Sequence, residues 1–148
     1  MTAKEKKCID LVADRFAQEE AGNREAREWF DEYENATEGT QIAMRVITEK
    51  NGDCFNDYYD YYDWLNQSFL SFDFVEPFTF TDQKAGYWRL QISWGGPSSE
   101  FRIYADSNLS ICSIEYWYMD WFDGAYIDVE DHTESYNICE TFLEMQRY

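Results

Sequence analysis

The chain has 148 residues, with 30 acidic and 12 basic side chains, one histidine and a formal net charge of -18 at pH 7. This length suits one domain over residues 1–148, and folding can bury roughly two-thirds of the surface of the extended chain. Apolar residues make up 45% of the chain and aromatic residues 20%, which excludes a disordered acidic tail. The negative charge argues against direct binding to nucleic acid or to an anionic membrane, because both attract basic surfaces.

Export and membrane signals are not found in the sequence. Four of the first seven residues are charged and an amphipathic segment follows, so they do not form the apolar stretch of a signal peptide. No apolar run approaches membrane-spanning length. The cysteines are scattered without a C-x-x-C pair, which favours buried free thiols over a disulfide framework or a zinc site. We therefore expect a cytoplasmic protein whose thiols stay reduced. The four cysteines are Cys8, Cys54, Cys112 and Cys139.

Helical periodicity dominates the first half of the chain. Residues 9–16 and 24–33 carry apolar side chains at helical spacing, with an interruption at Gly22-Asn23. Residues 40–49 fit either a helix or a strand. From Cys54 to Phe69 the apolar residues are spaced three and four apart, which predicts one amphipathic helix.

From about Ser71 the apolar period changes to two, as in strands that are buried on one face. Short turns at 95–98 and 106–108 separate three predicted strands, over residues 87–94, 101–105 and 109–119. In the first strand Trp88, Leu90, Ile92 and Trp94 form the inner side, and Tyr87, Arg89, Gln91 and Ser93 form the outer side. Such short turns imply an antiparallel meander.

A closing helix over residues 133–146 completes the prediction. Its inner side carries Ile138, Cys139, Phe142, Leu143 and Met145. The predicted fold class is α+β, with N-terminal helices, a central antiparallel sheet in meander order and a C-terminal helix.

Acidic residues are distributed unevenly. Residues 1–50 contain 8 basic and 12 acidic side chains, whereas residues 51–148 contain 4 basic and 18 acidic ones. No Lys or Arg occurs between Arg102 and Arg147, a stretch with ten acids. Carboxylates within a Debye length of about 8 Å repel one another and lower stability. We therefore expect so negative a surface to serve binding, and we expect basic partners.

The first candidate interface lies within the helix predicted at 54–69. On a helical projection Asp57, Asp60 and Asp63 lie roughly 120°, 180° and 120° from the centre of the apolar stripe, and Trp64 lies about 140° from it. The carboxylates then define the outward face, with a large aromatic ring among them. Acids around an exposed Trp are typical of a protein interface. The alternative is that Trp64 packs against another element.

The second candidate interface follows the third predicted strand. Residues 120–126 alternate carboxylates with aromatic side chains, and Gly124 favours a turn there. In one interpretation Trp121 and Phe122 fill the core and the acids beside them are merely solvated. In the other, these residues extend an acidic binding surface to which the final helix contributes. The partner-binding residues of this stretch are then Asp120, Asp123, Asp128, Glu130, Asp131, Glu140 and Glu144.

Catalytic and metal-binding patterns are absent from the sequence. His132 directly precedes the final helix. Because it is the only histidine, a site built from several histidines is excluded. No G-x-S-x-G occurs, and residues 128–140 lack the alternating acids and the central Gly of a calcium loop. We predict no catalytic residue, no metal and no cofactor. Carboxylates mixed with aromatic side chains leave a carbohydrate-binding or glycosidase-like cleft as a further reading.

The charge pattern favours a decoy. Duplex DNA presents about one charge per 1.7 Å of axis, and carboxylates can meet the Lys and Arg that line a DNA channel by charge-assisted hydrogen bonds. In size, acidity and aromatic content the chain resembles the small DNA-mimic inhibitors of phages and mobile elements, the anti-CRISPR and anti-restriction proteins. That resemblance implies evasion of host defence, with a CRISPR-Cas effector or a restriction enzyme blocked before it engages DNA.

Other functions fit the same charge. An immunity protein or antitoxin that caps a basic nuclease toxin is the main alternative within the binding class. A salt-adapted soluble protein is another, although the aromatic content does not support it. The target and the oligomeric state are left open by the sequence, and so is the choice between DNA mimicry and the block of a conformational change.

Overall fold

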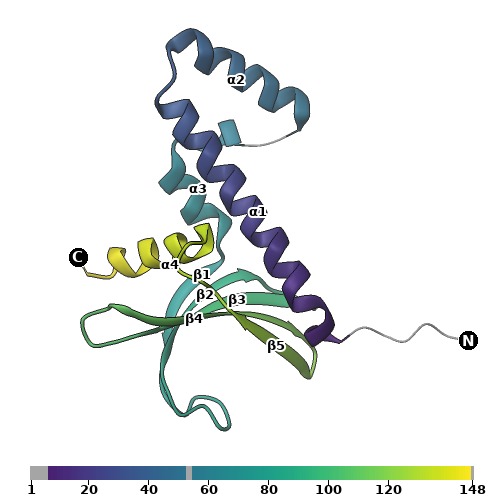
Figure 1. The fold of residues 1–148 in the computed structure, drawn as a ribbon, viewed down its shortest axis with the longest axis vertical. Helices are drawn as coiled ribbons and strands as arrows, with labels where there is room; N and C mark the ends of the chain where they lie inside the picture. Colours follow the sequence, from purple (N-terminus) through teal and green to yellow (C-terminus); the bar gives the residue numbers. More distant parts are fainter. Residues whose placement is uncertain (1–6, 53–54, 148) are drawn as a thin grey trace, which may run out of the picture. The chain divides into compact units, whose positions relative to one another are not determined.

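The computed structural model describes residues 7–52 and 55–147 (Figure 1). Two compact units emerge: Met1–Glu20 with Phe69–Tyr148, which we call the sheet unit, and Ala21–Ser68, which we call the helical unit. The first helix, α1 (Cys8–Glu34), runs through both, so its first half belongs to the sheet unit. The predicted folding of residues 1–148 as one domain stays a prediction.

Helix α1 is continuous, so the predicted interruption at Gly22-Asn23 was wrong. A glycine within a helix costs about 1 kcal/mol relative to alanine. Burial of Ala26 and Phe30 in the following turns outweighs that cost.

The ambiguous residues 40–49 lie in a second helix, α2 (Glu38–Asn51). The Thr37 side chain caps its start by accepting a hydrogen bond from the backbone N–H of Thr40, and Gly52 ends it with a left-handed φ of 78°. Trp29 of α1 donates its indole N–H to Thr48 of α2 at 3.0 Å. These caps, together with this contact, favour a helix over a strand.

A continuous helix from Cys54 to Phe69 is not formed, so that prediction was wrong. The segment contains a 3-10 turn, η1 (Phe55–Asp57), and a helix, α3 (Tyr61–Ser68); Cys54 lies outside the described residues. The side chain of Asp60 accepts a hydrogen bond from the backbone N–H of Asp63 at 2.9 Å, so Asp60 caps the start of α3. The N-cap preference of aspartate overrides the apolar periodicity here.

The sheet confirms the predicted α+β fold and meander order. Five antiparallel strands follow one another in the order β1-β2-β3-β4-β5. They are β1 (Ser71–Val75), β2 (Tyr87–Ser93), β3 (Ser98–Ala105), β4 (Ile111–Asp120) and β5 (Asp123–Asp128). The turn predicted within residues 120–126 is confirmed at Trp121-Phe122, whereas Gly124, which suggested it, lies in β5.

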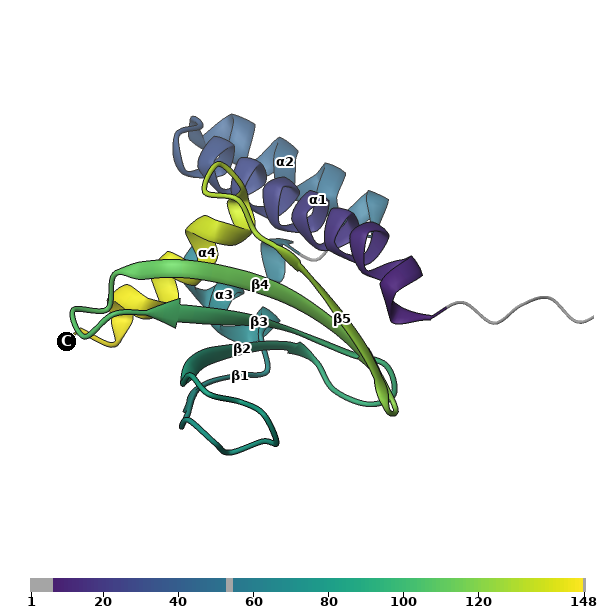
Figure 2. The same ribbon diagram turned by 60° about the horizontal axis from the view of Figure 1, so that its bottom comes forward.

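One face of the sheet, the covered face, packs against helices of the same unit. The rings of Phe16 in α1 and Tyr116 in β4 lie 5.4 Å apart, and those of Phe72 in β1 and Phe142 near the C-terminus also lie 5.4 Å apart. Leu90 is fully buried there. The other face, the open face, lies on the side of the β1–β2 loop, which projects away from α1 in Figure 2.

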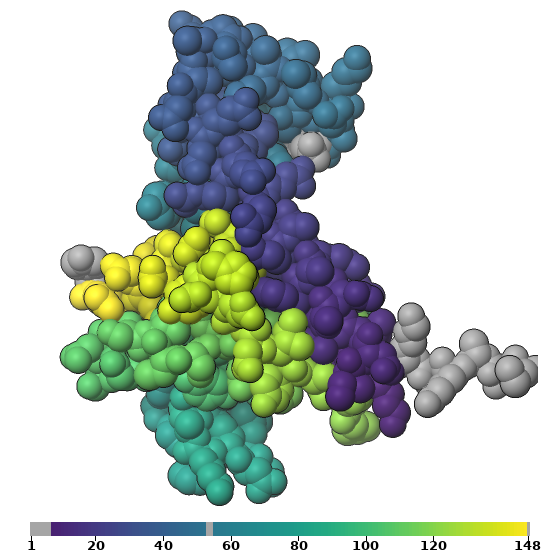
Figure 3. All heavy atoms as spheres, viewed as in Figure 1, coloured from purple at the N-terminus to yellow at the C-terminus, as the bar shows by residue number. Residues whose placement is uncertain are grey.

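The last helix, α4 (Glu134–Met145), buries Ile138, Cys139, Phe142 and Leu143 as predicted, whereas Met145 is exposed because it lies in the final turn. Figure 3 shows the yellow atoms of α4 directly against the green atoms of the sheet. Glu20 of α1 accepts hydrogen bonds from the backbone N–H groups of Glu134 (3.0 Å) and Ser135 (2.8 Å) at the start of α4. One partly buried carboxylate thus joins the two helices of the covered face.

The three described cysteines are free. Cys8 and Cys139 are buried, as predicted, whereas Cys112 is exposed. Burial raises the pKa of the Cys139 thiol well above its ordinary value. In the described part of the chain, no helix has both the length and the apolar character needed to cross a membrane.

Candidate functional site

The three carboxylates of the first predicted interface do not share one helix face. Asp57 is exposed at the end of η1, and Asp60 caps α3. Asp63 accepts hydrogen bonds from the backbone N–H of Tyr59 (2.9 Å) and from the Gln67 amide (2.7 Å), and these bonds lower the pKa of Asp63. Two of the three carboxylates therefore have local structural partners.

Trp64 is only half-exposed. Its ring stacks on that of Tyr61, one turn earlier in α3, at 5.8 Å and 17°. The guanidinium of Arg27 lies 4.9 Å from the centre of the Tyr61 ring. Trp64 thus packs on its own helix, and part of its ring surface stays accessible.

The tip of the β4–β5 hairpin is strongly exposed. Trp121 is 89% exposed and Phe122 is 104% exposed, which contradicts the interpretation that these rings fill the core. The chain reverses at these two residues, and Trp121 has a left-handed φ of 57°. The hairpin therefore presents two large rings to solvent.

Carboxylates flank this tip. Asp120 and Asp123 face each other across the β4–β5 ladder, an arrangement of like charges that lowers the stability of a sheet. Asp123 accepts a hydrogen bond from the backbone N–H of Cys8 at 2.7 Å, which holds the pKa of Asp123 below its ordinary value. Asp123 therefore serves the start of α1, whereas Asp120 has no basic partner among the described residues.

The remaining predicted acids are all exposed in the sheet unit. Glu130 pairs with His132 at 3.3 Å, and Glu144 pairs with Arg147 at 3.6 Å. The acids that lack a basic partner within the described residues are Asp128 at the end of β5, Asp131 in the following loop and Glu140 on α4. Because the two predicted interfaces belong to different units, each is a separate candidate surface.

A row of charged side chains crosses the open face in register, which the sequence analysis missed. Neighbouring strands contribute Asp73, Arg89, Arg102, Glu115 and Asp128 in turn. Two arginines thus stand opposite each other, and so do two carboxylates. The sequence contained one signal, because Arg89 and Arg102 each fall at a polar position in a strand with alternating apolar and polar residues. The pairing of the two residues depends on strand register, which cannot be read from one strand alone.

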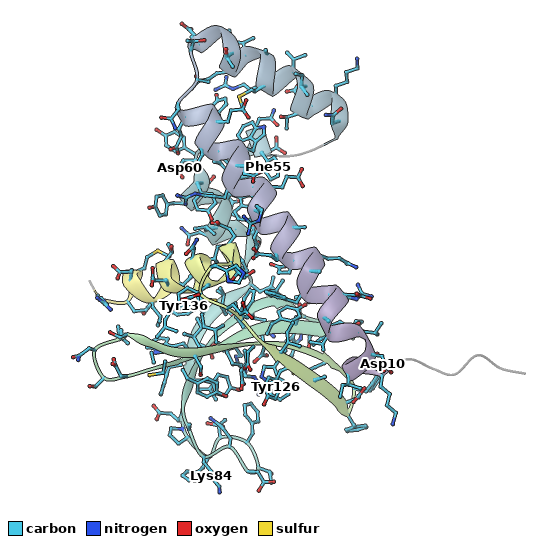
Figure 4. The ribbon with its side chains drawn as sticks, in the orientation of Figure 1. Asp10, Phe55, Asp60, Lys84, Tyr126 and Tyr136 are labelled. Carbon is cyan, nitrogen blue, oxygen red and sulfur yellow. The ribbon has the colours of Figure 1, made fainter. Side chains whose placement is uncertain are left out.

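An open cavity of about 900 Å³ lies over the two arginines of this row. Its floor includes Arg89 and Arg102, and its walls include the rings of Trp94, Trp117 and Trp121. Trp94 was predicted on the inner side, but β2 ends at Ser93 and the Trp94 ring is 76% exposed. Figure 4 shows Lys84, another lining residue, in the loop that hangs on this side of the sheet.

Arg102 is held rigidly in the cavity floor. Its guanidinium carbon lies 4.0 Å from the centre of the Trp117 ring and 4.9 Å from that of Tyr87. Its Nε donates to Glu100 at 2.9 Å, whereas its Nη2 reaches only the sulfur of Met119 at 3.7 Å. A thioether is a weak acceptor, so this edge of the guanidinium is poorly satisfied.

Two buried polar groups on the same face have no hydrogen-bond partner. They are the hydroxyl of Tyr87, whose residue is 1% exposed, and the amide nitrogen of Gln91. Both residues were predicted on the solvated outer side, whereas the structure buries them. An unsatisfied buried donor costs about 1–3 kcal/mol. These two groups on the open face therefore lower the stability of the fold.

Metal and histidine chemistry finds no support in the described residues. Within 7–52 and 55–147, no three His, Cys, Asp or Glu side chains come together as metal ligands. His132 is exposed, and its Nδ1 lies 3.3 Å from the carboxylate of Glu130. Comparison with family models, with curated proteins and with solved structures gives no match.

Proposed function

We propose that this protein is a non-enzymatic acidic inhibitor that docks on the basic nucleic-acid-binding surface of another protein and blocks its access to DNA. The observation that carries the proposal is the β4–β5 hairpin, which exposes Trp121 and Phe122 between facing carboxylates. The targets that suit it are a CRISPR-Cas effector or a restriction enzyme, whose DNA channels are lined with Lys and Arg.

The two kinds of side chain at this hairpin have complementary roles in docking. Exposed carboxylates steer a basic partner and accept charge-assisted hydrogen bonds from its arginines. Trp is among the residues that most often contribute the binding energy of a protein interface. An aromatic pair surrounded by acids therefore suits a basic surface that has an apolar pocket.

The sheet unit supplies the stronger candidate surface. Asp128, Asp131 and Glu140 are exposed and have no basic partner among the described residues, so their charge is free to meet a partner. In the helical unit, Asp60 and Asp63 already bind local backbone groups. We expect that unit to contribute less.

Capture from a bacterial lysate on the immobilised full chain tests this function. Bound proteins are eluted with rising salt and identified by mass spectrometry, and duplex DNA is added as a competitor. We expect a nucleic-acid-binding protein in stoichiometric amount, displaced by DNA. A nuclease toxin that DNA does not displace would favour the immunity-protein reading, and proteins lost only at low salt would contradict both.

Two variants with equal charge locate the surface. The triple variant Asp128→Asn, Asp131→Asn and Glu140→Gln should weaken capture at least tenfold. The matched control Glu25→Gln, Glu32→Gln and Glu34→Gln removes three exposed acids from the second half of α1 and should retain capture. Equal losses in the two variants would show that net charge acts without a defined surface.

A further inference from the structure

The open face of the sheet carries a second candidate site, which shares Trp121 with the hairpin surface. Residues 51–148 contain only four basic side chains, and three of them, Lys84, Arg89 and Arg102, line the cavity. In so acidic a chain this gathering of cations is a local exception.

The arginines of the cavity are arranged in a way that folding does not favour. Arg89 and Arg102 are directly opposite across β2 and β3, and like charges in that position destabilise a sheet. Asp73 takes one edge of Arg89 through two hydrogen bonds of 3.2 and 2.8 Å, and Glu100 takes the Nε of Arg102. The remaining edge of Arg102, against a thioether, still offers donors.

The unsatisfied groups of this face share one character, because all of them can donate. Two of them line the cavity, the Nη2 of Arg102, which reaches only a thioether, and the hydroxyl of Tyr87. The amide nitrogen of Gln91 lies on the same face outside the cavity lining. Burial raises the pKa of Tyr87, so its hydroxyl keeps its proton at neutral pH. A ligand that completes this floor must therefore bring acceptor oxygens.

The rim of the cavity specifies the rest of the ligand. Trp94 is 76% exposed and Trp121 is 89% exposed, and both line the cavity. Flat rings stack on such side chains. The volume of about 900 Å³ falls within the range of small-molecule sites, about 300–1,000 Å³.

We propose that this cavity binds a small organic anion with a flat ring, the ring stacked on Trp94 and the carboxylate or phosphate oxygens facing Arg102 and Tyr87. The acids that line the cavity, Asp82 and Glu100, limit the charge that it accepts. They exclude a long polyanion, which the rest of the acidic surface would also repel.

Calorimetric titration of the full chain tests the site with two pairs of probes. Indole-3-carboxylate is compared with neutral 3-methylindole, and adenosine monophosphate with adenosine. We expect one anion per chain, bound at least tenfold more tightly than its neutral counterpart. Tighter binding of indole-3-carboxylate would indicate a carboxylate ligand, and tighter binding of adenosine monophosphate would indicate a phosphate ligand.

Variants assign the binding to the cavity. Trp94→Ala and Tyr87→Phe should each weaken the anion at least tenfold. Phe122→Ala, which removes an exposed ring of the same hairpin tip that does not line this cavity, should leave the affinity unchanged and should weaken only the capture of a protein partner.

Several outcomes would overturn the proposal. Equal binding of the neutral probes would do so, as would binding of a neutral sugar such as cellobiose in place of the anions. No heat at millimolar concentrations of any probe would do so as well. None of these results bears on capture by the hairpin surface, so the two proposals fail separately.

Discussion

The two faces of the sheet are made by the same strands, yet they differ in how well their buried polar groups are hydrogen-bonded and their charges are paired. On the covered face, Leu90 and Phe101 are fully buried beneath helices that are joined through Glu20. On the open face, Arg89 stands opposite Arg102, and Tyr87 has a buried hydroxyl without a partner. The first face thus has the buried side chains and paired polar groups that stabilise a fold. The second retains destabilising features, which are typical of surfaces that bind.

The largest difference between the faces is expected from truncation of an apolar side chain. Leu90→Ala removes a fully buried side chain of the covered face and should cost about 2–5 kcal/mol of unfolding free energy. Trp94→Ala, which follows it by four residues at the rim of the open face, should change stability by no more than about 0.5 kcal/mol. Urea unfolding measures both, and a large loss for Trp94→Ala would mean that the open face contributes to folding.

The next effect concerns the carboxylate that joins α1 to α4. Glu20→Ala leaves the N–H groups of Glu134 and Ser135 without their acceptor and should cost about 1–3 kcal/mol. Glu25→Ala, an exposed acid in the same helix, serves as the control and should have little effect. If both variants unfold at the same urea concentration, the hydrogen bonds of Glu20 to the start of α4 do not stabilise the fold.

A smaller effect, of opposite sign, is expected at the end of the open row. Asp128→Lys replaces a pair of like charges, Glu115 and Asp128, with an attractive pair and should raise stability by about 0.2–1 kcal/mol. The same variant should weaken capture of the partner. Asp131→Lys, in the loop after β5, lacks that cross-strand neighbour and should not stabilise; a gain as large as that of Asp128→Lys would point to net charge alone.

The smallest effect at neutral pH comes from a buried tyrosine of the covered face. Burial raises the pKa of Tyr116 to about 12, from an ordinary value of 10. The unfolded chain therefore releases this proton first as pH rises, so its stabilising effect is complete below pH 10 and is lost between about 10 and 12. Tyr116→Phe should flatten that decline in urea unfolding, and an unchanged slope would contradict the assignment.

The fold could be predicted from the sequence because the spacing of the apolar residues distinguishes helices from strands. The change of period near Ser71 separates helices from sheet, and the short turns require a meander. The errors lie where a local effect competes with the period. Asp60 starts a new helix by capping it, and Gly22 fails to end one because burial continues beyond it.

The candidate sites were only partly predictable. Sequence locates the acids and the rings at 120–123, but a tight turn at Trp121-Phe122 decides that the rings are exposed. The row from Asp73 to Asp128 joins residues from five strands and depends on register, which one strand cannot reveal. The missing partner of Tyr87 depends on packing, so no pattern in the sequence could have shown it.

The most direct test of the contrast between the two faces is the unfolding free energy of Tyr87→Phe in urea. The variant removes a buried hydroxyl that has no partner, so we expect it to be more stable than the parent by about 1 kcal/mol. Tyr104→Phe is the matched control, because its hydroxyl donates to Glu115 at 3.2 Å, and it should be less stable by a similar amount. A loss for Tyr87→Phe as large as that for Tyr104→Phe would show that the open face is satisfied by folding alone and would contradict its role in binding.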